Sequence, residues 1–99
     1  MEMILTAQMV SSEEAVKFGL VNKVVFSNDL LNEATKIANK IISNSPLAIS
    51  KAIKSVNSGF IDGVDGFEVE KKEFGSCFQT QDFTEGVSAF IEKRKPNFN

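Results

Sequence analysis

Apolar residues recur at helical spacing along almost the whole of this 99-residue chain, and this periodicity constrains the fold more than any other feature. It is clearest in segment 28–43, where one helix face collects Leu30, Ala34, Ile37 and Ile41. The pattern predicts an all-α fold of four to five helices with one short extended segment.

The extended segment is residues 20–25, Leu-Val-Asn-Lys-Val-Val, which is the one convincing strand candidate. No second segment offers itself as a partner strand. Because backbone N–H and C=O groups of a strand need pairing, a lone strand indicates that part of the fold lies elsewhere.

Helix boundaries are marked by capping residues. Ser11 with Glu14 three residues later fits a capping box, and Gly19 suits the left-handed end of that short helix. Ser45 followed by Pro46 predicts an N-cap and a first helical residue.

The C-terminal third predicts two further helices. Glycines around Asp62 indicate a turn before a helix that ends near Phe78. Asp82 with Glu85 could cap a last helix that runs to about Lys93.

Composition limits the possible function classes. The chain is 42% hydrophobic and 24% charged with a formal charge of −2, as in a globular domain and unlike a general nucleic-acid binder. Its one cysteine cannot form an internal disulfide, which fits a reducing compartment. The start lacks a signal-peptide pattern, and no run approaches the roughly 20 apolar residues of a membrane span. We therefore expect a cytoplasmic protein without nucleic-acid or membrane partners.

The chain offers no catalytic constellation of its own. Histidine is absent, which excludes Ser–His and Cys–His pairs and, with a single cysteine, argues against a structural zinc site. Glu70 and Glu73 could share a helix face and form part of a metal site or an acid/base pair. Because Lys71 and Lys72 are adjacent and no second carboxylate-rich segment faces them, a solvated helix surface is the favoured interpretation. No catalytic residue and no metal ligand is predicted.

The basic tail Glu92-Lys93-Arg94-Lys95 has two interpretations. It is either a solvated C-terminus or an anion site, since Lys and Arg can both engage phosphate.

Four blocks in order resemble the crotonase family of enoyl-CoA hydratases and isomerases. The first is Met1-Glu2-Met3-Ile4-Leu5-Thr6, the second Glu14-Ala15 with Gly19-Leu20-Val21-Asn22, and the third Ser45-Pro46-Leu47-Ala48 with Lys51. The fourth and most specific is the tail, with Phe78, Thr80, Asp82, Glu85-Gly86, Ala89-Phe90 and Glu92-Lys93-Arg94-Lys95-Pro96-Asn97-Phe98. Together these blocks cover nearly the whole chain.

The resemblance implies the C-terminal helical part of a crotonase (ClpP/crotonase-like) fold. Residues 1–99 would form a C-terminal helical and trimerisation region, with residues 1–25 as the remnant that links to a missing catalytic core. Met1 matches an interior family position. The two catalytic glutamates of the family and its oxyanion-hole segments lie upstream, and no residue here matches them, so the piece itself is expected to be inactive.

The resemblance also implies partners and a site. The parent enzyme would add water across the double bond of enoyl-CoA thioesters in fatty-acid metabolism, as a homo-oligomer (trimer or hexamer) that needs no cofactor. Phe90 matches a family aromatic near the CoA, and Lys93 matches a basic residue near its phosphates. The alternative is a free-standing helical self-association module without catalysis.

Overall fold

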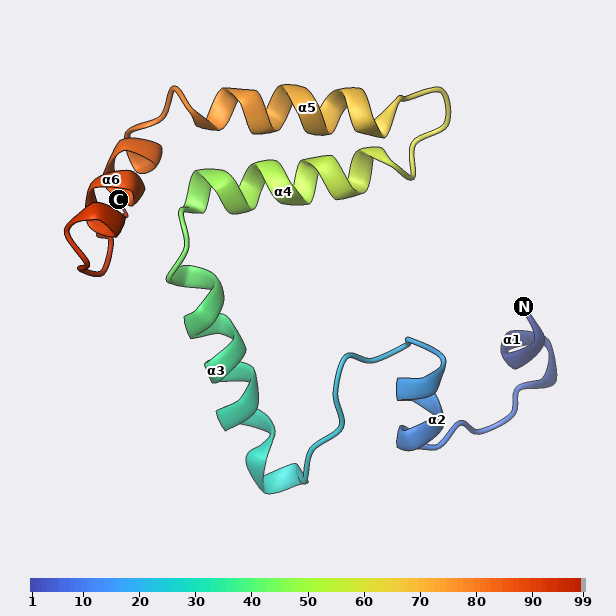
Figure 1. The fold of residues 1–99 in the computed structure, drawn as a ribbon. Helices are drawn as coiled ribbons and strands as arrows, with labels where there is room; N and C mark the ends of the chain where they lie inside the picture. The colour runs from blue at the N-terminus through green and yellow to red at the C-terminus, as the bar shows by residue number, and fades with distance from the viewer. Residues whose placement is uncertain (99) are drawn as a thin grey trace. The chain divides into compact units, whose positions relative to one another are not determined.

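The computed structural model describes residues 1–98. The chain divides into two compact units, the first Met1–Thr35 and the second from Lys36 onward. Within the described residues all regular structure is helical: six α-helices and one 3₁₀ turn, with no strand (Figure 1). The predicted all-α class is confirmed. The described helices number six, one more than the upper end of the predicted four to five.

The first unit contains two short helices, α1 (Glu2–Thr6) and α2 (Ser12–Lys17). The predicted capping box of α2 is confirmed: the Ser11 hydroxyl oxygen accepts the Glu14 N–H at 3.2 Å, and the Glu14 carboxylate accepts the Ser11 N–H at 2.9 Å. Gly19 follows with a φ of +72°, which glycine adopts without the steric penalty that a Cβ brings. The start of the chain is therefore ordered by local hydrogen bonds.

Residues 20–26 connect α2 to the 3₁₀ turn η1 (Ser27–Asp29) and to α3 (Leu30–Ile42), which continues into the second unit. The strand candidate at 20–25 lies outside every helix and pairs with no strand of the described chain. Within the first unit, Lys23 Nζ and Glu33 Oε2 form an ion pair at 2.5 Å.

The second unit is built on α4 (Pro46–Ser58) and α5 (Gly66–Cys77), which pack antiparallel (Figure 1). Ser45 caps α4 as predicted, since its hydroxyl accepts the Ala48 N–H at 3.0 Å and Pro46 opens the helix. A Cβ on Gly66 would lie 3.0 Å from the Cα of Gly59, so a side chain there would force the hairpin apart.

Glu73 on α5 binds lysines of α4, so the prediction that its carboxylate is solvated is wrong. It is buried, with 8% of its surface exposed, and it accepts hydrogen bonds from Lys54 and, at 3.4 Å, from Lys51. These hydrogen bonds, the Lys54 one above all, lower the pKa of Glu73 in spite of its burial. Glu73 is therefore a structural anion between the two helices.

The last helix, α6 (Gln81–Ile91), is joined to the start of α4 by a hydrogen bond from the Ser45 hydroxyl to the buried Asp82 carboxylate. Among residues 1–98 the one buried apolar residue is Ala89, with 1% exposed. The larger apolar side chains, including every Phe, Leu and Ile, are at least partly open to solvent. The described helices are all too short or too polar to cross a membrane.

Candidate functional site

The N-terminus of α6 is capped by Thr80, which the sequence pattern did not predict to be a cap. The Thr80 side chain accepts the Phe83 N–H at 3.1 Å, so Thr80 is the N-cap rather than Asp82. The predicted pairing of Asp82 with Glu85 as a cap is wrong, because both carboxylates bond to groups elsewhere in the second unit.

The C-terminal end of α6 closes in a tight left-handed turn. The Arg94 N–H donates to the Ala89 carbonyl at 3.0 Å, and the Lys93 N–H donates to the Phe90 carbonyl at 3.3 Å. Lys93 has a φ of +54°, the left-handed region that normally favours glycine. The helix thus ends at Ile91, earlier than predicted, and the chain reverses at Lys93.

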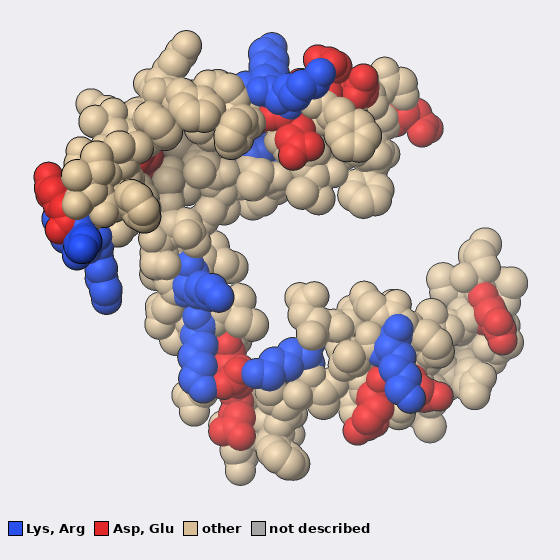
Figure 2. Space-filling model, in the orientation of Figure 1, with Lys and Arg blue, Asp and Glu red and all other residues tan. Residues whose placement is uncertain are grey.

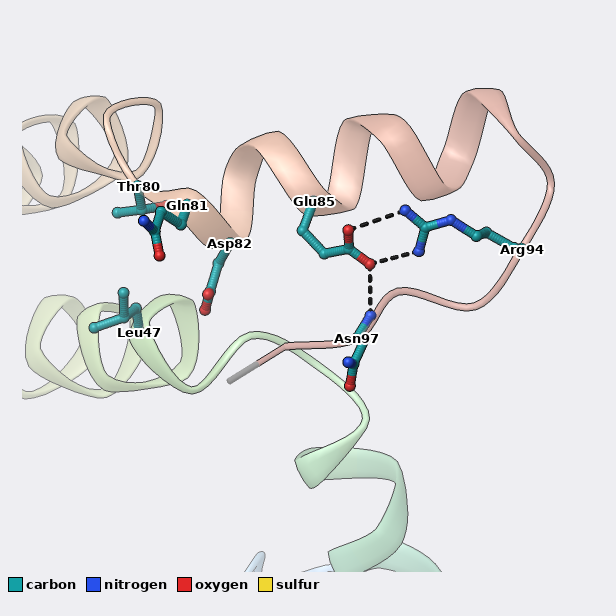
Figure 3. Close-up of a pocket in the computed structure, with 7 residues that line it drawn as sticks. All are labelled: Leu47, Thr80, Gln81, Asp82, Glu85, Arg94 and Asn97. Atoms are coloured by element: carbon teal, nitrogen blue, oxygen red, sulfur yellow. Dashed lines mark hydrogen bonds and ion pairs between the residues drawn. The ribbon is translucent and has the colours of Figure 1, made fainter.

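Beyond this turn the tail folds back onto α6 through Glu85 (Figure 3). The Arg94 guanidinium donates two hydrogen bonds to the Glu85 carboxylate, at 2.6 Å and 3.0 Å, and the Asn97 backbone N–H donates a third at 2.7 Å. We call Glu85, Arg94 and Asn97 the tail clamp. Fork-to-fork pairing of this kind is the strongest geometry for an Arg–carboxylate pair.

The tail clamp changes the ionisation of both charged partners. The Arg94 hydrogen bonds, followed by that of Asn97, lower the pKa of Glu85 to about 2. Glu85, followed by Glu92, raises the pKa of Arg94 above its already high value. Both groups are therefore fully charged at neutral pH.

An open pocket of about 650 Å³ lies between the start of α4, the start of α6 and the returning tail (Figure 3). Its lining comprises Leu47, Thr80, Gln81, Asp82, Glu85, Arg94 and Asn97. The side chains that could act as acids or bases here already have partners, which limits their use in proton transfer.

Of the two residues predicted to contact CoA, Phe90 lies in the last turn of α6 and Lys93 in the turn that follows the helix. Both lie outside the lining of that pocket. Phe90 is 85% exposed, and its carbonyl accepts the Lys93 N–H, so the two residues belong to one turn of chain. Basic side chains gather beside acidic ones at this end of the chain (Figure 2). The acidic partners Glu85 and Glu92 bind Arg94, whereas Lys93 and Lys95 form no ion pair within residues 1–98.

Glu85 and Arg94 stand in separate parts of the tail pattern, and the sequence alone does not predict that they pair. They are nine residues apart and meet because the chain reverses at Lys93. A left-handed turn is normally marked in a sequence by glycine, and a lysine at this position does not predict a chain reversal.

Comparisons with known proteins give a consistent result over the whole chain. A family model described as enoyl-CoA hydratase/isomerase matches residues 1–99. The chain is 44% identical over 95 residues to a short-chain-enoyl-CoA hydratase of Clostridium acetobutylicum, covering 95% of this chain and 36% of the relative. It is 44% identical over 99 residues to a mitochondrial enoyl-CoA hydratase of Pongo abelii, covering 99% of this chain and 34% of the relative.

Solved structures agree with the sequence matches. The crystal structure of an enoyl-CoA hydratase from Bacillus anthracis superposes with a TM-score of 0.90 at 38% identity, covering 98% of this chain and 38% of that one. A structure described as a putative enoyl-CoA hydratase/isomerase from Mycobacterium abscessus gives a TM-score of 0.87 at 36% identity, covering 99% of this chain and 41% of that one. The chain therefore spans little more than a third of the length of these relatives.

Proposed function

The chain belongs to the enoyl-CoA hydratase/isomerase family, and we propose that it is the C-terminal part of an enzyme that hydrates enoyl-CoA thioesters. In this proposal its role is to contact CoA and to assemble subunits, while the chemistry is carried out by the part of the family fold that the chain does not span. Residues 1–25 would link it to that catalytic core. A cytoplasmic location is in keeping with the free thiol of Cys77.

The observation that best supports a CoA contact is the conformation of Lys93. A non-glycine residue at a φ of +54° carries a conformational cost of roughly 1 kcal/mol that glycine would avoid. A lysine in this strained conformation is expected where its side chain makes a functional contact that glycine could not make. Lys93 has no ion pair within residues 1–98, so its ammonium group suits a phosphate. Phe90, three residues earlier at the end of α6, is 85% exposed, and its ring suits an adenine or pantetheine surface.

We predict that Lys93→Ala weakens binding of coenzyme A to the chain about tenfold. A charge-assisted hydrogen bond to phosphate contributes roughly 1.5–3 kcal/mol, and each 1.4 kcal/mol corresponds to a factor of ten in affinity. Titration of the ¹⁵N-labelled chain with coenzyme A, followed by NMR, measures the change.

Two controls define the result. Lys72→Ala removes one positive charge from α5 and is expected to leave the affinity within twofold. Pantetheine, which has no phosphate, should bind the parent chain and Lys93→Ala equally. Equal coenzyme A affinities for the parent chain and Lys93→Ala would refute the phosphate contact.

A second candidate function is self-association without catalysis, which the exposed apolar side chains favour. Phe60, Phe67 and Phe90 are each at least 80% exposed, and they lie on or beside different helices of the second unit. Exposed apolar surface of this extent is typical of interfaces. The same surface would serve subunit assembly of the parent enzyme as a trimer or hexamer.

We therefore predict that the chain at high micromolar concentration sediments as a species heavier than its 10.9 kDa monomer. Phe67→Ser, which removes an 80% exposed ring from the first turn of α5, should lower the association constant about tenfold, because burying a phenylalanine contributes roughly 1.5–3 kcal/mol. Sedimentation equilibrium measures both values. A monomer at every concentration would exclude self-association.

A further inference from the structure

The tail clamp controls the turn that carries Lys93. Arg94, the next residue along the chain, has its backbone N–H on the Ala89 carbonyl and its guanidinium on Glu85, Glu92 and the Lys95 carbonyl. Three residues later, the Asn97 N–H returns to the same Glu85 carboxylate. Glu85 therefore fixes the chain immediately after Lys93 and again at Asn97.

A strained residue needs such restraint. A non-glycine residue in the left-handed region persists where its surroundings determine it. Upstream of Lys93 the helix supplies that restraint through Ala89, which is buried. Downstream, a Cβ on Gly86 would lie 3.8 Å from the Phe98 ring. The returning segment therefore packs closely on α6. The Glu85 carboxylate is the acceptor that ties this returning segment to the helix.

The tail clamp pairs Arg94 with carboxylates and leaves the two neighbouring lysines without such partners in the described chain. The charge of Arg94 is matched by Glu85 and Glu92, at 2.6 Å from one oxygen of each. Lys93 and Lys95, on either side of it, keep their charges available within the described chain. A phosphate that approaches the turn thus meets the two lysines, while Arg94 acts as a structural cation.

We propose that Glu85 is a positioning residue that holds Lys93 in place for the phosphates of coenzyme A. This inference rests on the function proposed above. It adds a residue that does not touch the ligand and acts through Arg94 and the Asn97 backbone.

The test compares two substitutions of the same kind in the full 99-residue chain, titrated with coenzyme A. Glu85→Gln neutralises the acceptor of the Arg94 fork and of the Asn97 N–H and replaces one of its two oxygens with an NH₂ group, which cannot accept from the fork. Glu92→Gln makes the same change at the single contact to the Arg94 Nε. Each change makes the tail more positive by one unit. Electrostatics alone would make both variants bind the anionic ligand more tightly. Positioning requires that Glu85→Gln bind about fivefold more weakly while Glu92→Gln binds equally or more tightly.

An NMR signal reports the tail clamp without the ligand. The amide proton of Asn97 should shift as Glu85 titrates. Because the pKa of Glu85 falls from 4.5 to about 2, the tail clamp is complete above about pH 4.5 and is lost as the pH falls through 2. This shift is expected in the parent chain and absent in Glu85→Gln, while the helical circular dichroism of the two proteins stays the same.

The possible outcomes separate the two proposals. If Lys93→Ala weakens coenzyme A binding but Glu85→Gln does not, the phosphate contact stands and the positioning role is refuted. If Lys93→Ala has no effect, the phosphate contact itself fails, and the positioning role fails with it. If Glu85→Gln loses helical signal, Glu85 maintains the fold and the positioning role is again refuted.

Discussion

The purified chain is expected to hydrate crotonyl-CoA no faster than buffer does, although it belongs to a family of hydratases. Enzymes of ordinary efficiency accelerate their reactions at least about 10⁶-fold, so the predicted loss is the entire catalytic effect. The measurement is the decrease in ultraviolet absorbance as water adds to the conjugated thioester.

The state of the carboxylates explains this expectation. Hydration needs a group that exchanges a proton near neutral pH. Glu85, which lines the open pocket, has a pKa of about 2 and is locked to Arg94, so it is a weak base and is not protonated to act as an acid. Asp82, its neighbour in the pocket, accepts the Ser45 hydroxyl, and Glu73 is held between two lysines.

The matched control is the Clostridium acetobutylicum short-chain-enoyl-CoA hydratase, assayed at the same molar concentration. Its activity verifies the substrate and the assay. Hydration by the 99-residue chain that disappears in Asp82→Asn or Glu85→Gln would contradict the prediction and would place a catalytic site in the open pocket.

Replacing Ser45 with alanine is expected to lower the free energy of unfolding of the Lys36–Asn99 unit by roughly 2–4 kcal/mol. One hydroxyl group makes two contacts: it accepts the Ala48 N–H at the start of α4 and donates to Asp82. Loss of an N-cap costs about 1 kcal/mol. Leaving the 92% buried Asp82 without this donor costs a further 1–3 kcal/mol or so, since a buried acceptor then lacks its partner. Urea unfolding followed by far-ultraviolet circular dichroism gives the difference.

Thr80→Ala is the comparison that isolates the contact to Asp82. Thr80 caps α6 in the same way, through the Phe83 N–H, but bonds to no buried carboxylate. Loss of the Thr80 cap should lower the free energy of unfolding by about 1 kcal/mol. Equal destabilisation by the two substitutions would mean that the bond between α4 and α6 contributes nothing measurable.

The features that could be predicted from the sequence are those encoded within three or four residues. The capping box of Ser11 with Glu14 and the Ser45-Pro46 start of α4 are local patterns, and both are confirmed. Local hydrogen bonds fix them whatever the rest of the chain does.

The features that escaped prediction depend on residues far apart in the sequence. The adjacent lysines on α5 favour a solvent-exposed position for Glu73, but its carboxylate contacts Lys54 and Lys51, 19 and 22 residues away on α4. Glu85 reaches Arg94 through the reversal at Lys93. The likeness to known hydratases marked Phe90 and Lys93, while the residue proposed to hold Lys93 in place became visible only in the structure.

The scarcity of buried apolar residues has a consequence for the life of the chain in a cell. Ala89 is the one buried apolar side chain among residues 1–98, so these residues gain little from a core of their own, and the folded population rises with the concentration of a partner that covers the exposed rings. A copy without such a partner offers open apolar segments to chaperones and proteases. The cellular abundance of the chain would then follow the concentration of that partner, because proteases would degrade the copies that have none bound.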